Sequence, residues 1–154
     1  MRALSLVLAL LAPQAAAAQT GIEVDMELVL AVDVSRSMSP AELEIQRIGY
    51  AEALRSQAVM GAVQGGFLGR IAVTYVEWAG EASQNVVADW TILAAPEDAE
   101  ALAARILATR SPTMRRTSIS GAIRFGLARF GESPFTSYRR VIDVSGDGPN
   151  NQGE

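Results

Sequence analysis

Three oxygen-bearing side chains, Asp33, Ser35 and Ser37, occupy every second position just after a nearly continuous apolar run. This run, residues 27–32, predicts a strand that is buried on both faces of a parallel sheet. In an extended segment alternate side chains point the same way, so one carboxylate and two hydroxyls can meet at one point. Such hard oxygen ligands suit a small divalent cation, Mg²⁺ first, with Mn²⁺ or Ca²⁺ as alternatives.

Two further oxygen-bearing residues, Thr117 and Asp147, stand in segments that a parallel sheet would bring to the same edge. Thr117 precedes a predicted helix, and Asp147 follows the last predicted strand. Ligands of such sheets bind outside the carboxyl ends of the strands. Five candidate oxygen ligands around a six-coordinate cation leave at least one position for water or for a group from a partner.

Each of these residues also has a simpler explanation. Asp and Ser are common in turns, so the string 33–37 is a weak signal by itself. Thr117 or Ser118 would serve as the cap of the following helix, and Asp147-Gly148 as an ordinary tight turn. The joint arrangement of three polar segments at one sheet edge is what favours a metal site.

The composition excludes several kinds of chemistry. The chain has neither Cys nor His, so thiolate catalysis, disulfides and a Ser-His-Asp triad are impossible. All 13 basic residues are arginines, and the net charge is −4. The only basic pairs are Arg115-Arg116 and Arg139-Arg140. This distribution argues against nucleic acid as a partner.

The first eighteen residues have the pattern of a secretory signal peptide. A basic residue is followed by the apolar run 3–12 and by three small residues at 16–18. An uncleaved N-terminal anchor is the alternative. We therefore expect an exported protein, periplasmic or secreted, with a polar lead at residues 19–26. No later apolar segment is long enough to span a membrane.

The remaining pattern predicts strands separated by helices. Strands are expected at 27–32, 70–78, 86–93 and 139–144, and helices at 40–59, from 96, and at 119–130. The half-polar alternation of 86–93 indicates an edge strand antiparallel to its predecessor. The predicted fold class is α/β: a Rossmann-like, doubly wound, mostly parallel sheet with helices on both faces and one antiparallel edge strand.

Four motifs, "AVDVSRSMS", "YVEWAG", "RTSISGAI" and "VIDVSGDGPNN", resemble those of the von Willebrand factor type A (vWA) domain. They are similar to an uncharacterised bacterial group of exported vWA-like proteins. The resemblance runs from about residue 26 to 148 and includes the family's metal-ion-dependent adhesion site. It implies that Asp33, Ser35 and Ser37 are first-loop ligands, that Thr117 is the second-loop ligand and that Asp147 is the third-loop ligand.

The resemblance implies a binding activity rather than catalysis. An acidic side chain of a partner protein would fill the open position of the bound cation. A full domain of this kind would resemble a six-stranded sheet with two further strand-and-helix units after the third loop. We therefore expect residues 27–154 to form a vWA-like domain that lacks its last strands and helices. Its last strand would be an exposed edge, which is a stability liability.

Two alternatives to a binding module remain. A metal-dependent hydrolase or phosphatase would use the same cation, but Ser35 replaces the second acid of such enzymes and no Lys is present. The other alternative is a truncated fragment without function of its own.

The roles of several neighbouring residues stay open. Asp143 would either brace the site or face solvent. Arg36, Arg115 and Arg116 would weaken a cation site, attract an acidic partner or point to water. Trp78 and Trp90 are predicted to belong to the core. 

Overall fold

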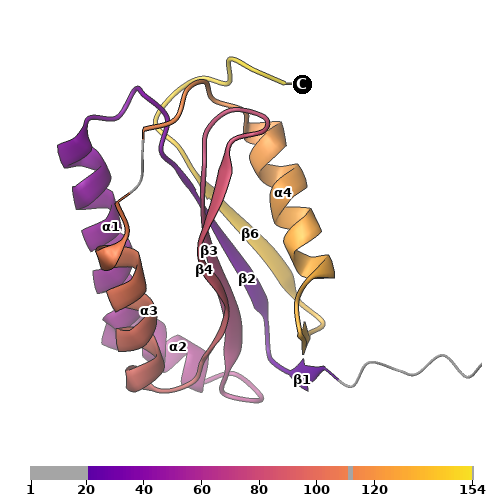
Figure 1. Cartoon of the computed structure of the whole chain (residues 1–154). Helices are drawn as coiled ribbons and strands as arrows, with labels where there is room; N and C mark the ends of the chain where they lie inside the picture. Colours follow the sequence, from indigo (N-terminus) through magenta and orange to yellow (C-terminus); the bar gives the residue numbers. More distant parts are fainter. Residues whose placement is uncertain (1–20, 111–112, 154) are drawn as a thin grey trace, which may run out of the picture.

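The computed structural model describes residues 21–110 and 113–153, which form a four-stranded mixed sheet with helices on both faces and a separate two-stranded sheet (Figure 1). The predicted α/β fold class is confirmed. The elements in chain order are β1 (Ile22–Glu23), β2 (Glu27–Asp33), α1 (Pro40–Arg55), α2 (Gln57–Gln64), β3 (Ile71–Trp78), β4 (Gln84–Leu93), α3 (Pro96–Ala108), α4 (Ile119–Gly131), β5 (Phe135–Thr136) and β6 (Arg140–Ser145).

The strand order in the main sheet is β4-β3-β2-β6. The central strand β2 runs parallel to β3 on one side and to β6 on the other. The outer strand β4 is antiparallel to β3, as the sequence predicts. Helices α1, α2 and α3 cover one face of the sheet and α4 covers the other (Figure 1). The carboxyl ends of the three parallel strands therefore lie at the same edge.

Alternation along β2 distributes its side chains between two hydrophobic clusters. Leu30 and Val32 belong to the cluster that includes residues of α1 and α3. Val29 and Ala31 pack on the other face with residues of α4 such as Phe130. Phe125 of α4 is partly buried and packs against the same cluster. Because β2 is covered on both faces, its sequence is apolar throughout its middle.

The predicted helix over residues 40–59 is wrong as one continuous element. It divides at Ser56, which has extended backbone between α1 and α2. The Ser56 hydroxyl donates to the carbonyl of Ala53 and accepts the backbone N–H of Val59. A serine side chain that forms such hydrogen bonds to the backbone replaces regular helical hydrogen bonds, so one helix ends and a new one begins at this residue.

The predicted polar lead contains a short strand. Residues 22–23 of β1 pair in parallel with residues 135–136 of β5. The predicted signal peptide, residues 1–18, lies outside the described residues. No helix in the described part of the chain combines the length and hydrophobicity that a bilayer crossing requires.

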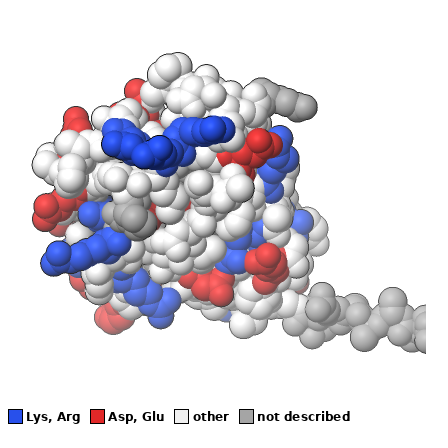
Figure 2. All heavy atoms as spheres, turned by 45° about the horizontal axis from the view of Figure 1, so that its top comes forward, with Lys and Arg blue, Asp and Glu red and all other residues white. Residues whose placement is uncertain are grey.

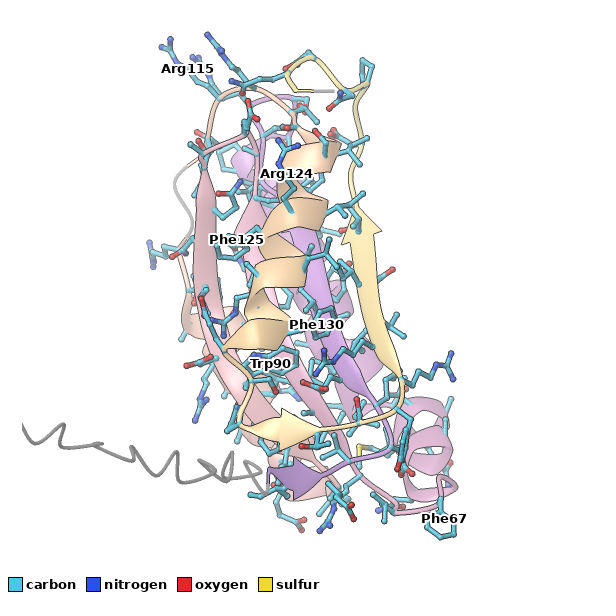
Figure 3. The ribbon with its side chains drawn as sticks, turned by 90° about the vertical axis from the view of Figure 1, so that its right-hand side faces the viewer. Phe67, Trp90, Arg115, Arg124, Phe125 and Phe130 are labelled. Atoms are coloured by element: carbon cyan, nitrogen blue, oxygen red, sulfur yellow. The ribbon has the colours of Figure 1, made fainter. Side chains whose placement is uncertain are left out.

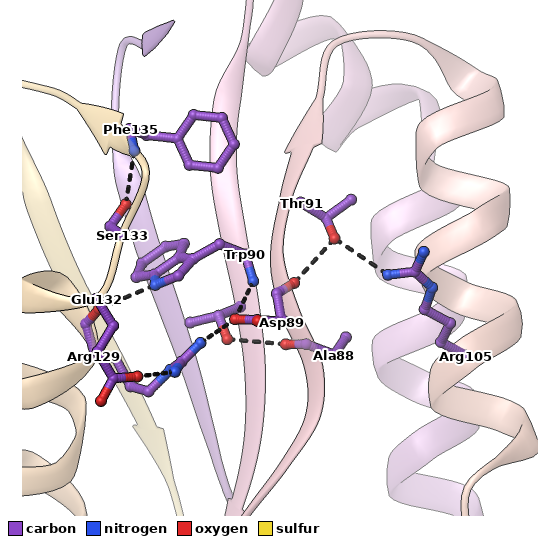
Figure 4. A network of polar contacts seen from close by, with 10 residues as sticks. Ala88, Asp89, Trp90, Thr91, Arg105, Arg129, Glu132, Ser133 and Phe135 are labelled. Carbon is purple, nitrogen blue, oxygen red and sulfur yellow. Dashed lines mark hydrogen bonds and ion pairs between the residues drawn. The ribbon is translucent and has the colours of Figure 1, made fainter. Parts of the chain in front are cut away.

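A network of polar side chains joins β4 to the end of α4 (Figure 4). The buried guanidinium of Arg129 pairs with the carboxylates of Asp89 and Glu132. The indole N–H of Trp90 donates to the carbonyl of Arg129 at 3.0 Å, and the Trp90 ring packs on Phe130. Trp90 is thus half-buried, whereas Trp78 is fully buried as predicted. 

The outer edge of the sheet at β6 is open in the described residues. β6 pairs with β2 on one side, and no strand within 21–110 or 113–153 pairs with its other side. The sequence-based expectation that this strand is a sheet edge agrees with this arrangement.

Candidate functional site

The candidate site begins where β2 ends. Asp33 is its last residue and is completely buried. Its Oδ1 accepts the backbone N–H of Ser35 at 2.7 Å, which fixes the turn that follows the strand. The hydroxyls of Ser35 and Ser37 lie 2.9 Å apart. The three side chains predicted to converge do so.

The loop after β6 brings Asp147 to the same place. The Ser37 hydroxyl donates to Asp147 Oδ1 at 2.9 Å, across 110 residues of sequence. The parallel pairing of β2 with β6 explains this contact, because both strands end at the same sheet edge. Gly146 allows the close approach: a Cβ at this position would lie 3.1 Å from Asp33 Oδ2. 

The second carboxylate oxygen of Asp33 has no hydrogen-bond partner, although it is buried. Neighbouring Trp78 has a buried indole nitrogen that likewise lacks an acceptor. No basic side chain in the described residues pairs with Asp33. An unpaired carboxylate in such an environment is costly unless a proton or a cation compensates it.

The electrostatics of Asp33 agree with this picture. Burial raises the pKa of its carboxyl above the ordinary value. The backbone N–H and hydroxyl of Ser35 and the backbone N–H of Asp147 oppose that rise, while the charge of the Asp147 carboxylate adds to it. The two carboxylates thus lie close enough to interact, and no ion pair within residues 21–110 and 113–153 involves either of them. This is the electrostatic arrangement that a divalent cation relieves.

Thr117 lies in the adjoining loop but is not part of this hydrogen-bonded set. It is buried, and its backbone carbonyl accepts the N–H groups of Asn151 and Gln152. No hydrogen bond within the described residues joins its side chain to Asp33, Ser35, Ser37 or Asp147. The helix cap is Ser118, whose hydroxyl accepts the N–H of Gly121 at 3.1 Å. The capping role considered for Thr117 therefore falls to its neighbour.

Two asparagines that sequence reasoning missed tie the second loop to the third. Asn151 Oδ1 accepts the backbone N–H of Thr117 at 2.9 Å. Asn150 Oδ1 accepts the backbone N–H of Ile119 at 3.0 Å, at the start of α4. Asparagine is a good acceptor for the free N–H groups at the start of a helix. The two asparagines of the sequence "PNN" were the signal that could have indicated these contacts. These side chains position Thr117 relative to Asp147.

The other charged residues that the sequence analysis considered near the site are exposed. Asp143 on β6 is exposed, which agrees with the solvent-facing alternative rather than a bracing role. Arg36, Arg115 and Arg116 are also exposed. The loop of Arg115 is held against the first loop, because the N–H of Met114 donates to the carbonyl of Val34 at 3.1 Å.

The donor set fits a hard divalent cation. It consists of two carboxylates and two hydroxyls, all oxygen, with one buried carboxylate oxygen left unpartnered. No cluster of three or more Cys, His, Asp or Glu side chains that could hold a metal occurs among residues 21–110 and 113–153. A metal would therefore be held by the two carboxylates, which balance the charge of a divalent cation, and by the two neutral hydroxyls, with coordination positions left for further oxygen ligands.

The candidate site also lies apart from a cleft of about 570 Å³. That cleft is lined by α1 residues such as Leu43 and Arg47 and by residues at the end of α3, including Leu107. None of the five candidate ligands contributes to it. The candidate ligands therefore do not line this cleft.

Comparison with known proteins places the chain in a family. It belongs to the family described as Protein of unknown function (DUF1194), which it matches over residues 23–154, and this family is vWA-like. No match was found among the curated proteins.

Solved structures with a similar fold come from pili. The vWF domain of the type V pili tip protein Mfa5 from Porphyromonas gingivalis has a TM-score of 0.55 and 16% sequence identity. That match covers 82% of this chain and 39% of the other. The pilus adhesin SpaC from Lactobacillus rhamnosus GG has a TM-score of 0.50 and 18% sequence identity, and that match covers 77% of this chain and 14% of the other. The chain thus spans well under half the length of these proteins, and at such identities the likeness shows the vWA-like fold alone.

Proposed function

We propose that this protein is a divalent-cation-dependent protein-binding module, with Mg²⁺ as the first candidate cation and Mn²⁺ or Ca²⁺ as alternatives. Asp33, Ser35, Ser37 and Asp147 would hold the cation, with Thr117 as a further ligand from the neighbouring loop. The observation that carries the proposal is the buried, unpartnered Oδ2 of Asp33 beside a second carboxylate.

The cation would supply an open coordination position for an oxygen ligand. The chain's own residues would hold it through one buried and one exposed carboxylate and through the serine hydroxyls. The hydrogen bonds that join Ser35, Ser37 and Asp147 support this assignment, because they already gather the oxygens at one point. A carboxylate of a partner protein is the ligand chemistry that best matches such a site.

A binding role is favoured over a catalytic one. The chain contains no His, Cys or Lys, and Ser35 occupies the position where an aspartate-based phosphatase would need its second acid. The structural neighbours named above are pilus tip and adhesin domains. An exported location, periplasmic or secreted, follows from the signal-peptide pattern at residues 1–18 and stays a prediction.

Titration calorimetry of the purified chain with MgCl₂, MnCl₂ and CaCl₂ tests the metal site. Asp33→Ala should abolish binding of the preferred cation because it removes the buried ligand. Asp143→Ala is the matched control: it removes an exposed carboxylate from the adjacent strand β6 and should bind as the parent does. Equal affinity of the parent and Asp33→Ala would show that the assignment is wrong.

A further inference from the structure

The arginines next to the candidate site differ from most other arginines of the chain. Arg36, Arg115 and Arg116 are exposed, and none of them forms an ion pair or a side-chain hydrogen bond within the described residues. Several other guanidinium groups are matched: those of Arg124, Arg129 and Arg140 contact the carboxylates of Glu81, Asp89 and Glu27. In a chain with a net charge of −4, three unmatched positive charges thus stand beside the candidate ligands.

Two loops place these arginines around the site. Arg36 stands between Ser35 and Ser37 in the first loop. Met114, bonded to the carbonyl of Val34, precedes Arg115 and Arg116, and Thr117 follows them. Figure 2 shows a band of basic side chains across the end of the molecule that is turned forward. In Figure 3 the side chain of Arg115 extends from this end, away from the sheet and helices.

The loop of Arg115 is fixed at both of its ends. Before the arginines the N–H of Met114 donates to the carbonyl of Val34 at 3.1 Å, and after them the N–H of Ser118 donates to the carbonyl of Ala79 at 2.8 Å. Between them Arg116 has a φ of 70°, in the left-handed region that residues other than glycine rarely adopt. The direction of the arginine side chains therefore depends on a defined backbone rather than on a free loop.

We infer that Arg36, Arg115 and Arg116 form a recognition surface for an acidic polypeptide segment, which carries further Asp or Glu residues beside the carboxylate that reaches the candidate site. This inference rests on the proposed function and specifies its partner. Unmatched surface arginines cost little in water, but they attract a partner of opposite charge and accelerate its association. A single carboxylate ligand would not need them.

The choice of a polypeptide over another polyanion follows from the rest of the surface. Acidic side chains such as Glu81 lie close to the arginine band, paired with Arg124 at 2.6 Å. A long, uniformly charged polymer would meet these carboxylates as well as the three arginines. A short acidic segment matches the extent of the positive surface.

Fluorescence anisotropy with a labelled peptide of alternating Asp and Glu tests the inference, with a Gln and Asn peptide as the neutral comparison. In low salt with MgCl₂ the parent chain should bind the acidic peptide and should not bind the neutral one. Arg115→Glu should weaken binding about five- to tenfold, and the double change with Arg116→Glu should weaken it further. Arg115→Lys should retain most of the affinity. Raising the salt to about 0.5 M should reduce these differences because screening shortens the range of the interaction.

Arg139→Glu is the matched control for charge. Arg139 is exposed and forms no side-chain ion pair, but it precedes β6 at the opposite end of the sheet from the candidate site. The substitution changes net charge as Arg115→Glu does, and we expect it to leave peptide affinity within about twofold of the parent. An equal loss in both variants would attribute the effect to net charge and overturn the inference.

The remaining outcomes separate the inference from the proposed function. Binding that EDTA abolishes but Arg115→Glu leaves unchanged would support the metal site and overturn the arginine surface. Binding that depends on Arg115 but not on the cation would support the surface and contradict the metal-dependent function. Arg115-dependent binding to vesicles with anionic lipid or to single-stranded DNA, without peptide binding, would overturn the choice of a polypeptide.

Discussion

Two buried carboxylates on the same strand, Glu27 and Asp33, have opposite surroundings. They stand at the two ends of β2 on the same face of the sheet, and both are inaccessible to solvent. Glu27 Oε2 accepts from Arg140 Nε at 3.1 Å and from the Ser137 hydroxyl at 2.9 Å. Asp33 has no basic partner in the described residues: the N–H and hydroxyl of Ser35 and the backbone N–H of Asp147 lower the pKa of its carboxyl, and the carboxylate of Asp147 raises it.

The difference separates a structural charge from a candidate functional one. Each carboxylate has one oxygen without a hydrogen-bond partner, so satisfaction of individual oxygens does not distinguish them. The presence of a positively charged side chain does distinguish them. Among the described residues the chain supplies a guanidinium to Glu27 and, at the other end of the same strand, no basic side chain to Asp33. We interpret the missing positive charge as the place of a ligand.

The largest expected effect follows from removing the structural carboxylate. In the metal-free chain, Glu27→Ala should lower the free energy of unfolding by about 2–3 kcal/mol, because two hydrogen bonds to a charged group are lost. Asp33→Asn should cost less than about 0.5 kcal/mol, because it removes a charge that nothing in the fold compensates. Urea denaturation without divalent cations measures both. A larger loss for Asp33→Asn than for Glu27→Ala would contradict the comparison.

A smaller effect is expected where the second loop meets the third. Asn151→Ala should lower stability by about 1 kcal/mol, because the N–H of Thr117 loses its acceptor. It should also weaken cation binding, since Thr117 would no longer be held near Asp147. Asn85→Ala, at an exposed position of β4, is the control and should change neither property. Unchanged cation affinity in Asn151→Ala would limit the asparagine to a structural role.

The smallest predicted effect concerns the acid sensitivity of the ion pair between Asp89 and Arg129. The backbone N–H of Trp90 lowers the pKa of Asp89 below 3.8, and Arg129 lowers it further against the opposing effect of burial. A lowered pKa contributes stability that is complete above 3.8 and is lost as the pH falls through the folded value. Asp89→Asn should therefore lose less stability than the parent on acidification from pH 6. Urea midpoints along a pH series test this, and an identical loss would contradict the assignment.

Much of the fold follows from patterns that the sequence carries locally. The apolar runs of β2 and β3, the half-polar alternation of β4 and the caps of α1 and α4 led to the observed class and sheet edges. The break at Ser56 was missed, because the choice between one bent helix and two depends on side-chain hydrogen bonds to the backbone. Apolar periodicity does not report such bonds.

The candidate site was predictable only in part. Alternation after β2 indicated that Asp33, Ser35 and Ser37 converge, and the parallel pairing with β6 accounts for Asp147. The roles of Asn150 and Asn151 depend on hydrogen bonds to residues more than thirty positions away, which spacing does not reveal. Thr117 is close in the chain to these contacts, but its side chain makes none with the other four, so its assignment as a ligand stays a prediction.

The stabilisation that MgCl₂ confers on the parent chain and on Asp33→Asn tests the central claim most directly. If the oxygens of Asp33, Ser35, Ser37 and Asp147 hold the cation, the parent should gain about 2.7 kcal/mol of unfolding free energy at a cation concentration one hundred times the dissociation constant. Asp33→Asn should gain none at that concentration. An equal gain in both proteins would place the cation elsewhere, and no gain in either protein, with Mn²⁺ or Ca²⁺ as well, would contradict the metal site.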